Sequence, residues 1–138
     1  MAQRDIYHTI VVNALIKDGW TITHDPLIIA YGRQNLFVDL GAEKLIAAER
    51  AGRQIAVEIK SFISPSGVSD LEDALGQYLL YRSLLSRKEP ERIIYLAVPA
   101  AAYTNVFRSP VGEVALQDFA LRLVVFDAEK ETIVEWIE

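Results

Sequence analysis

The most constraining feature of this sequence is the apolar run at residues 92–98, Arg-Ile-Ile-Tyr-Leu-Ala-Val, which ends at Pro99. Apolar side chains occupy both faces of a strand formed by this run, so layers of the protein must cover both sides of its sheet. Pro99 cannot donate to a strand ladder, so the strand is expected to end there. The run therefore predicts the central strand of a layered α/β domain.

The remaining segments supply helices and shorter strands around this strand. Apolar residues at helical spacing predict the first helix, and the capping-box pattern of Ser69 and Glu72 opens the longest one. In chain order we expect a helix over 5–18, strands over 20–23 and 27–31, a strand pair within 44–61, a helix over 70–87, the strand over 92–98, weaker helices over 101–108 and 111–119, and strands over 121–126 and 132–137. This order predicts one domain over residues 1–138, a mixed central β-sheet flanked by α-helices.

Residues 44–61 form two strand-like runs around a turn at Ala51-Gly52, although residues 42–50 also suit a helix because Ala, Glu, Lys and Leu dominate them. In a hairpin with this turn, Arg50 faces Arg53. That register places Glu43 opposite Lys60 and Leu45 opposite Glu58. On the second strand, residues 54, 56, 58 and 60 share one face, and residues 55, 57 and 59 share the other.

Composition limits the chemistry and the location of the protein. The chain has no cysteine and only two histidines, His8 and His24, so a bound metal is expected to have oxygen ligands. We interpret His8 as a helix-packing residue. The charged N-terminus and an apolar run of only ten residues at 93–102 predict a cytoplasmic protein without a membrane span, which needs about 20 apolar residues.

The chemically most informative residues are Glu58 and Lys60, two apart on an otherwise apolar strand. A carboxylate can hold a divalent metal that polarises a phosphate, and a nearby lysine can stabilise the charge that develops during phosphodiester hydrolysis. The alternative interpretation is a solvated or salt-bridged strand face. Because Mg²⁺ usually takes one or two protein carboxylates, we expect a second acid upstream.

Two residues are candidates for that second acid. Glu43 lies opposite Lys60 in the expected hairpin, so it shares the face of Glu58. Asp39 has the same parity as Glu43 but lies four residues further out, about 13 Å along a straight strand, unless Gly41 bends the chain back. The sequence leaves both candidates open.

An upstream acid followed by Glu58-Ile59-Lys60 resembles the pattern of the PD-(D/E)xK nuclease superfamily, which has the restriction-endonuclease-like fold. Gln77 and Tyr81 lie one turn apart on the following helix, similar to a glutamine-tyrosine motif in part of that superfamily, where the glutamine points into the active site. A core tyrosine with a hydrogen-bonding neighbour is the alternative. Some members of the superfamily also carry a glutamate on the first helix, whereas here only Asp5 and Asp18 flank that helix.

A second resemblance covers nearly the whole chain. The segments RDIYHTIVVNALIKDGWTITHDPL, VDLGAEKLIAAER, IAVEIKSF, ALGQYLLYR and RIIYLAVP are similar to the XisH family of cyanobacterial proteins, the fdxN element excision controlling factors. The resemblance implies an endonuclease-like fold, a role in programmed DNA excision beside a separate site-specific recombinase, and pairing with a small XisI-type protein.

The resulting hypothesis is a DNA-processing factor, an Mg²⁺- or Mn²⁺-dependent endonuclease with Asp39, Glu43 and Glu58 as candidate metal ligands and Lys60 and Gln77 as catalytic candidates. The alternative is a non-catalytic accessory protein that binds a recombinase, DNA or an XisI-like partner. The net charge of 14 − 19 = −5 favours this alternative, because it weakens DNA binding by the chain alone. A homodimer is left open.

Overall fold

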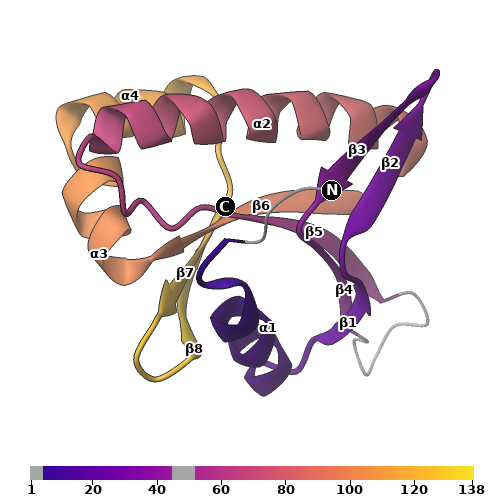
Figure 1. The fold of residues 1–138 in the computed structure, drawn as a ribbon, viewed down its shortest axis with the longest axis horizontal. Coiled ribbons are helices and arrows are strands. Elements are labelled where there is room, and N and C mark those ends of the chain that lie inside the picture. The colour runs from indigo at the N-terminus through magenta and orange to yellow at the C-terminus, as the bar shows by residue number, and fades with distance from the viewer. Residues whose placement is uncertain (1–4, 45–51) are drawn as a thin grey trace.

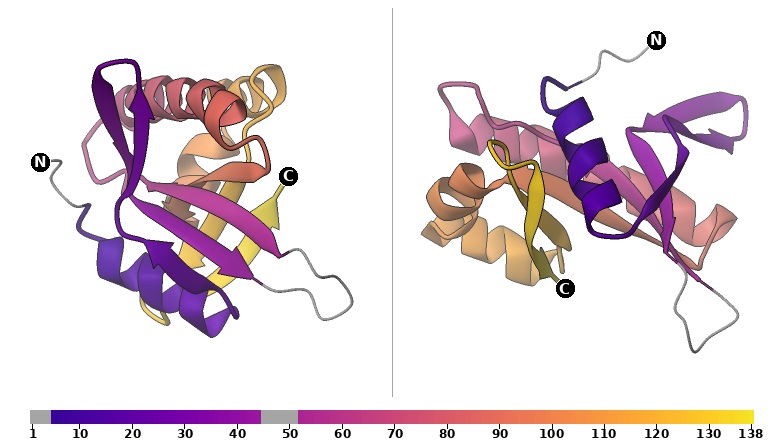
Figure 2. Two further views of the ribbon diagram at one scale, coloured as in Figure 1. Left: turned by 90° about the vertical axis from the view of Figure 1, so that its right-hand side faces the viewer. Right: turned by 90° about the horizontal axis from the view of Figure 1, so that it is seen from below.

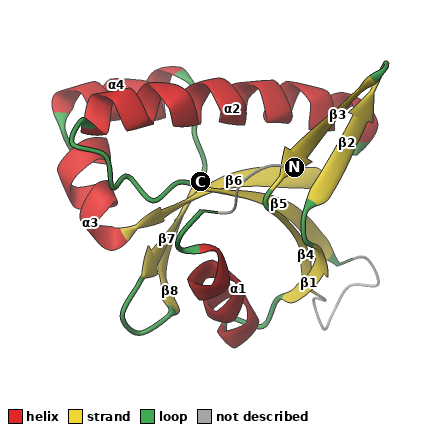
Figure 3. Cartoon of the chain, viewed as in Figure 1, coloured by secondary structure: helices red, strands yellow, loops and turns green. Residues whose placement is uncertain are grey.

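The computed structural model describes residues 5–44 and 52–138. A six-stranded sheet forms its centre (Figures 1 and 3). The spatial order is β1 (Thr21–His24), β4 (Leu40–Lys44), β5 (Arg53–Ile59), β6 (Arg92–Pro99), β7 (Leu123–Asp127) and β8 (Thr132–Ile137). The strands β5, β6 and β7 run parallel, and the outer pairs are antiparallel. The sheet is therefore mixed, and the apolar run at 92–98 belongs to a strand inside it, as predicted.

Helices cover both faces of this sheet (Figures 1 and 2). The long helix α2 (Gly67–Lys88) and α4 (Pro110–Asp118) lie on one face, and α1 (His8–Lys17) lies on the other. The short α3 (Ala100–Ala102) and the π-helix η1 (Tyr103–Phe107) connect β6 to α4. None of the helices in the described part of the chain is long and apolar enough to cross a membrane.

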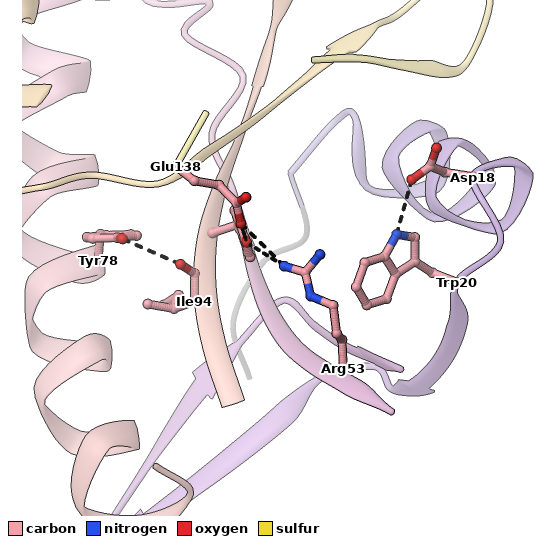
Figure 4. Close-up of polar contacts among 7 residues, drawn as sticks. Asp18, Trp20, Arg53, Tyr78, Ile94 and Glu138 are labelled. Atoms are coloured by element: carbon pink, nitrogen blue, oxygen red, sulfur yellow. Dashed lines mark hydrogen bonds and ion pairs between the residues drawn. The ribbon is translucent and has the colours of Figure 1, made fainter. Parts of the chain in front are cut away.

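Two apolar clusters result from the alternation of side chains along the strands. On β5, Ala56 joins the cluster on the α2 side, whereas Ile55 and Val57 join the cluster beneath α1. The buried Tyr78 of α2 donates its hydroxyl to the carbonyl oxygen of Ile94, 3.4 Å away, and so ties the helix to β6 (Figure 4). This alternation agrees with the faces predicted for β5.

The strands β2 (Leu27–Tyr31) and β3 (Gln34–Val38) form a separate two-stranded sheet that stands out from the central sheet beside α2 (Figures 1 and 2). We call residues 27–38 the β2–β3 arm. The sequence predicts the first of its strands but not the second, nor β4. Strand β4 lacks the alternation of apolar and polar residues that indicates a strand. Its first three residues, Leu40, Gly41 and Ala42, are non-polar and all buried.

The predicted hairpin register is wrong. In the structure Leu40 pairs with Val57 and Glu43 pairs with Gln54, a shift of six positions from the predicted pairing of Glu43 with Lys60. Lys44, the last residue of β4, pairs with Arg53, the first residue of β5, whereas the prediction pairs Arg53 with Arg50. The expected first strand beyond Lys44, the competing helix beyond that residue, and Ala51 of the expected turn lie outside the described residues.

Helix boundaries also differ from the prediction. Helix α2 begins three residues earlier than the capping box indicates, because the Ser66 hydroxyl, not that of Ser69, caps it by accepting from the Ser69 amide at 3.1 Å. Helix α1 begins at His8 instead of residue 5. The segment predicted as a helix over 101–108 divides into the end of α3 and the π-helix η1.

Candidate functional site

Asp39 and Glu58 meet where the chain passes from β3 into β4, next to the end of β5. The Asp39 amide donates to Glu58 Oε1 at 3.2 Å, and Asp39 Oδ2 accepts from the Ile59 amide at 2.7 Å. The observed ladder explains this, because Leu40 pairs with Val57 and the neighbouring residues are therefore Asp39 and Glu58. Two carboxyl groups thus share one small region on the α2 side of the sheet.

Burial raises the pKa values of both carboxyl groups, and the charge of Asp39 raises that of Glu58 further. Only 6% of Glu58 is exposed, and desolvation together with the Asp39 charge raises the pKa of Glu58 to about 9. Desolvation also raises the pKa of Asp39, although hydrogen bonds from the Ile59 amide and the Glu58 side chain oppose this. At neutral pH Glu58 therefore keeps a proton, because two buried carboxylates this close together cannot both ionise without a compensating cation.

Lys60 follows on the same strand face and is held by an acid that the sequence analysis does not identify. Its Nζ lies 4.0 Å from Asp70 Oδ1, and Asp70 Oδ2 accepts from the Ser64 amide at 3.2 Å. Asp70 is buried in the first turn of α2. It therefore orients the lysine and also fixes the segment that leads from β5 to α2.

Asp5, which precedes α1, contacts the segment that follows Lys60. Its Oδ2 accepts from the Ser61 amide at 3.0 Å, and its Oδ1 accepts from the Tyr7 amide at 2.9 Å. The charge of Asp5 also helps to raise the pKa values of Asp39 and Glu58. The structure therefore places an acid of the N-terminal region near the carboxyl pair. This acid differs from the superfamily pattern, because it is an aspartate before the helix and not a glutamate on it.

His8 lies at the start of α1 and is 4% exposed. Its Nε2 lies 2.8 Å from Asp25 Oδ1, and its charge lowers the pKa of Asp39. Within the described residues its Nδ1 has no hydrogen-bond partner. His8 therefore packs in the interior, as predicted, but it also contributes to the electrostatics of the site.

Tyr81 of α2 completes the surroundings of the pair. Its own burial and the charges of Glu58 and Asp39 raise the pKa of the Tyr81 hydroxyl to about 12. Gln77 lies one turn earlier and is exposed to solvent. Because residues 70, 77 and 81 recur at helical spacing, Gln77 shares a stripe with Asp70 and Tyr81, both of which face the site.

Glu43 does not join this group. It pairs with Gln54 in β5 and with Thr21 in β1. Since Gln54 and Glu58 are four residues apart, Glu43 lies about 13 Å along the strands from the carboxyl pair. The structure therefore brings Asp39, and not Glu43, to Glu58.

The carboxyl pair suits a hard divalent cation, which takes oxygen ligands and usually needs only one or two protein carboxylates, with water and phosphate filling the other positions. Within residues 5–44 and 52–138 there is no group of three His, Asp or Glu side chains that could hold a metal ion. A cation held by the two carboxyl groups of Asp39 and Glu58 would take water and phosphate oxygens at its other positions.

Comparison with known proteins identifies relatives over almost the full length. A family model described as XisH protein matches residues 1–134. A crystal structure of an XisH family protein from Nostoc punctiforme PCC 73102 has 41% identity and a TM-score of 0.86 and covers 97% of this chain and 100% of that one. A crystal structure of a fdxN element excision controlling factor protein from Anabaena variabilis has 41% identity and a TM-score of 0.87, covering 98% and 100%. No match was found among proteins of curated function.

Proposed function

The chain belongs to the XisH family, and from this premise we propose that it acts on DNA in the excision of an fdxN-type chromosomal element, as a metal-dependent endonuclease of the PD-(D/E)xK type. The single observation that carries the proposal is the Asp39–Glu58 carboxyl pair, in which Glu58 is buried and Asp39 is half-buried, with Lys60 directly after the end of β5. The name of the Anabaena variabilis relative supports the role in excision.

Each residue has a distinct role in this proposal. Asp39 and Glu58 would hold Mg²⁺ or Mn²⁺, which when bound supplies the charge that polarises a phosphodiester. Lys60, oriented by Asp70, would stabilise negative charge that develops on the phosphate. Gln77 is exposed on the stripe of α2 that faces the site, and its amide would orient the attacking water or the DNA backbone.

The charge of the protein suggests that it does not work alone. Its net charge is −5, whereas affinity for DNA comes largely from neutralising phosphates with basic side chains. We therefore propose that a small XisI-type protein and a site-specific recombinase contribute DNA contacts or targeting. The same net charge favours the second candidate function, that of an accessory protein which keeps the fold and binds these partners without cleaving DNA.

Cleavage and excision assays separate the two candidates. We expect Glu58→Ala and Lys60→Ala each to reduce Mg²⁺- or Mn²⁺-dependent DNA cleavage by about a hundredfold or more, since each removes charge stabilisation at the phosphate. Both variants should also fail to support element excision in cells. The assays compare each variant with the wild type, with and without an XisI-type partner.

Glu43→Ala is the matched control, because it removes an acid from β4 that the structure keeps away from Glu58. It should cleave DNA like the wild type. Gln77→Ala should lower cleavage more than it lowers the melting temperature. Excision that survives both Glu58→Ala and Lys60→Ala, without metal-dependent cleavage under any condition, would leave only the accessory function.

A further inference from the structure

The β2–β3 arm has the shape of a DNA-reading ribbon. Its two strands of five residues pair in simple antiparallel register from Leu27 with Val38 to Tyr31 with Gln34. At about 3.4 Å per residue such a ribbon is about 17 Å long. The major groove of B-DNA is about 12 Å wide and admits a two-stranded β-ribbon. The arm stands clear of the central sheet in both views of Figure 2, so a duplex can reach it.

The charge of the arm differs from that of the whole protein. The chain contains 19 acidic residues among 138, yet none lies between Asp25 and Asp39. Arg33, at the exposed tip, is the only charged side chain of the arm. The arm thus carries one positive charge at its tip and no negative charge along its strands, so its tip can face a phosphate backbone although the protein as a whole is acidic.

The exposed side chains of the arm also suit DNA. The tip presents Tyr31, Arg33 and Gln34, which can donate hydrogen bonds to phosphates or base edges. On the outward face, Ile28 is 53% exposed and pairs with Phe37, which is 38% exposed. Apolar groups of this kind can contact thymine methyl groups in the major groove.

The inward face anchors the arm and connects it to the site. Leu27, Ile29 and Val38 are buried in the apolar cluster that includes Tyr78 of α2. The last residue of β3, Val38, directly precedes Asp39, which contacts Glu58. A duplex that contacts the arm along its length would therefore extend from the tip towards the carboxyl pair at its base.

We propose that the β2–β3 arm inserts into the major groove of duplex DNA and positions the strand for the Asp39–Glu58 site. The inference rests on the proposed function for its substrate, but it concerns binding and needs no cleavage. Arg33 and Tyr31 supply contacts at the tip, and the apolar outward face supplies contacts along the groove.

The test measures the binding of a short fluorescein-labelled DNA duplex by fluorescence anisotropy, in EDTA so that metal-dependent cleavage cannot occur. We expect the double variant Tyr31→Ala, Arg33→Ala to bind at least about tenfold more weakly than the wild type at low salt. The slope of log affinity against log salt should fall by about 1, because one phosphate contact is lost. Arg33→Glu alone should weaken binding further.

The matched control is the double variant Arg108→Ala, Phe119→Ala, which removes one exposed arginine and one exposed aromatic ring outside the arm. It should bind within about twofold of the wild type. Circular dichroism of each variant checks that the fold is retained, as expected for exposed positions.

Three results would overturn the proposal. The first is that the arm variants bind like the wild type, and the second is that the wild type does not bind the duplex at low salt. The third is that sedimentation experiments show the arm variant to dissociate a dimer, so that the loss of binding follows from that dissociation. Metal-dependent cleavage is scored separately. Binding through the arm, with no cleavage even when an XisI-type partner is present, would refute the nuclease function and leave the binding role of the arm standing. Cleavage by a protein whose arm variants bind like the wild type would refute the binding role and leave the nuclease function standing.

Discussion

Glu58→Gln should make the metal-free protein more stable than the wild type at alkaline pH. In the folded protein, burial and Asp39 raise the pKa of Glu58 to about 9 from an ordinary value near 4.5. Between these values the folded state keeps a proton that the unfolded state has released. The free energy of unfolding therefore falls as pH rises, by up to about 1.4 kcal/mol per pH unit. Glutamine has no such proton and escapes this loss.

We expect the two proteins to be similar in stability at pH 5 and Glu58→Gln to be more stable by about 2 kcal/mol at pH 8, a value below the full slope because buried sites relax on ionisation. Urea unfolding across this range measures the difference. Added Mn²⁺ should stabilise the wild type at pH 8 and leave Glu58→Gln unchanged, since a cation that binds only the folded state raises its stability.

Glu43→Gln is the control for this experiment. It removes an acid of the same strand region that is not in contact with Asp39 or Glu58, so it should keep the pH profile and the Mn²⁺ response of the wild type. A flat pH profile of wild-type stability would contradict the burial of an interacting carboxyl pair.

Gly112→Ala should destabilise the protein by about 3 kcal/mol, the upper end of the usual range for overpacking, because the clash is with backbone atoms and side chains cannot relieve it. A Cβ atom at residue 112 would lie 2.0 Å from the Val106 carbonyl oxygen and 2.5 Å from the Phe107 Cα atom. Both are backbone atoms of η1, and Phe107 is completely buried. Helix α4 would have to move away from η1, which would disturb the core around Phe107.

Gly76→Ala provides a comparison of opposite sign. Gly76 is exposed in the interior of α2, and a Cβ atom there would meet nothing within 4 Å. Alanine has a higher helix propensity than glycine by about 1 kcal/mol, so this variant should be more stable than the wild type by about that amount. Chemical denaturation of both variants tests the pair, and a Gly112→Ala protein with wild-type stability would show that α4 does not pack on the η1 backbone.

The sequence predicts the strands and helices whose patterns are long and periodic. The apolar run of β6 is buried as expected, apart from the half-buried Ile93, and the predicted long helix is α2, with Leu71, Ala74, Tyr78 and Leu85 buried. The prediction fails where local patterns are short. Strand β4 has the sequence LGAEK, with neither alternation nor β-branched residues, so its pairing with β5 depends on tertiary contacts that a local pattern does not contain.

For the candidate site, too, the sequence predicts the residues that a local pattern identifies and misses those that only the fold brings together. Glu58 and Lys60 are recognisable because they are charged residues on an apolar strand, but the choice between Asp39 and Glu43 depends on a register that the sequence leaves open. Asp70 and Asp5 contact residues 60–64 through the fold, from positions that look like ordinary helix-terminal acids. One signal could have indicated Asp70, namely an acid in the first turn of the helix that follows the strand of Glu58.

Anomalous X-ray scattering from crystals soaked in Mn²⁺ at alkaline pH measures directly whether Asp39 and Glu58 together hold a divalent cation. We expect an anomalous peak between the two carboxyl groups, about 2 Å from an oxygen of each, and no such peak in Glu58→Gln crystals. Wild-type crystals without a peak at this pair, or with the ion bound instead at Glu43, would show that the Asp39–Glu58 pair is not the metal site.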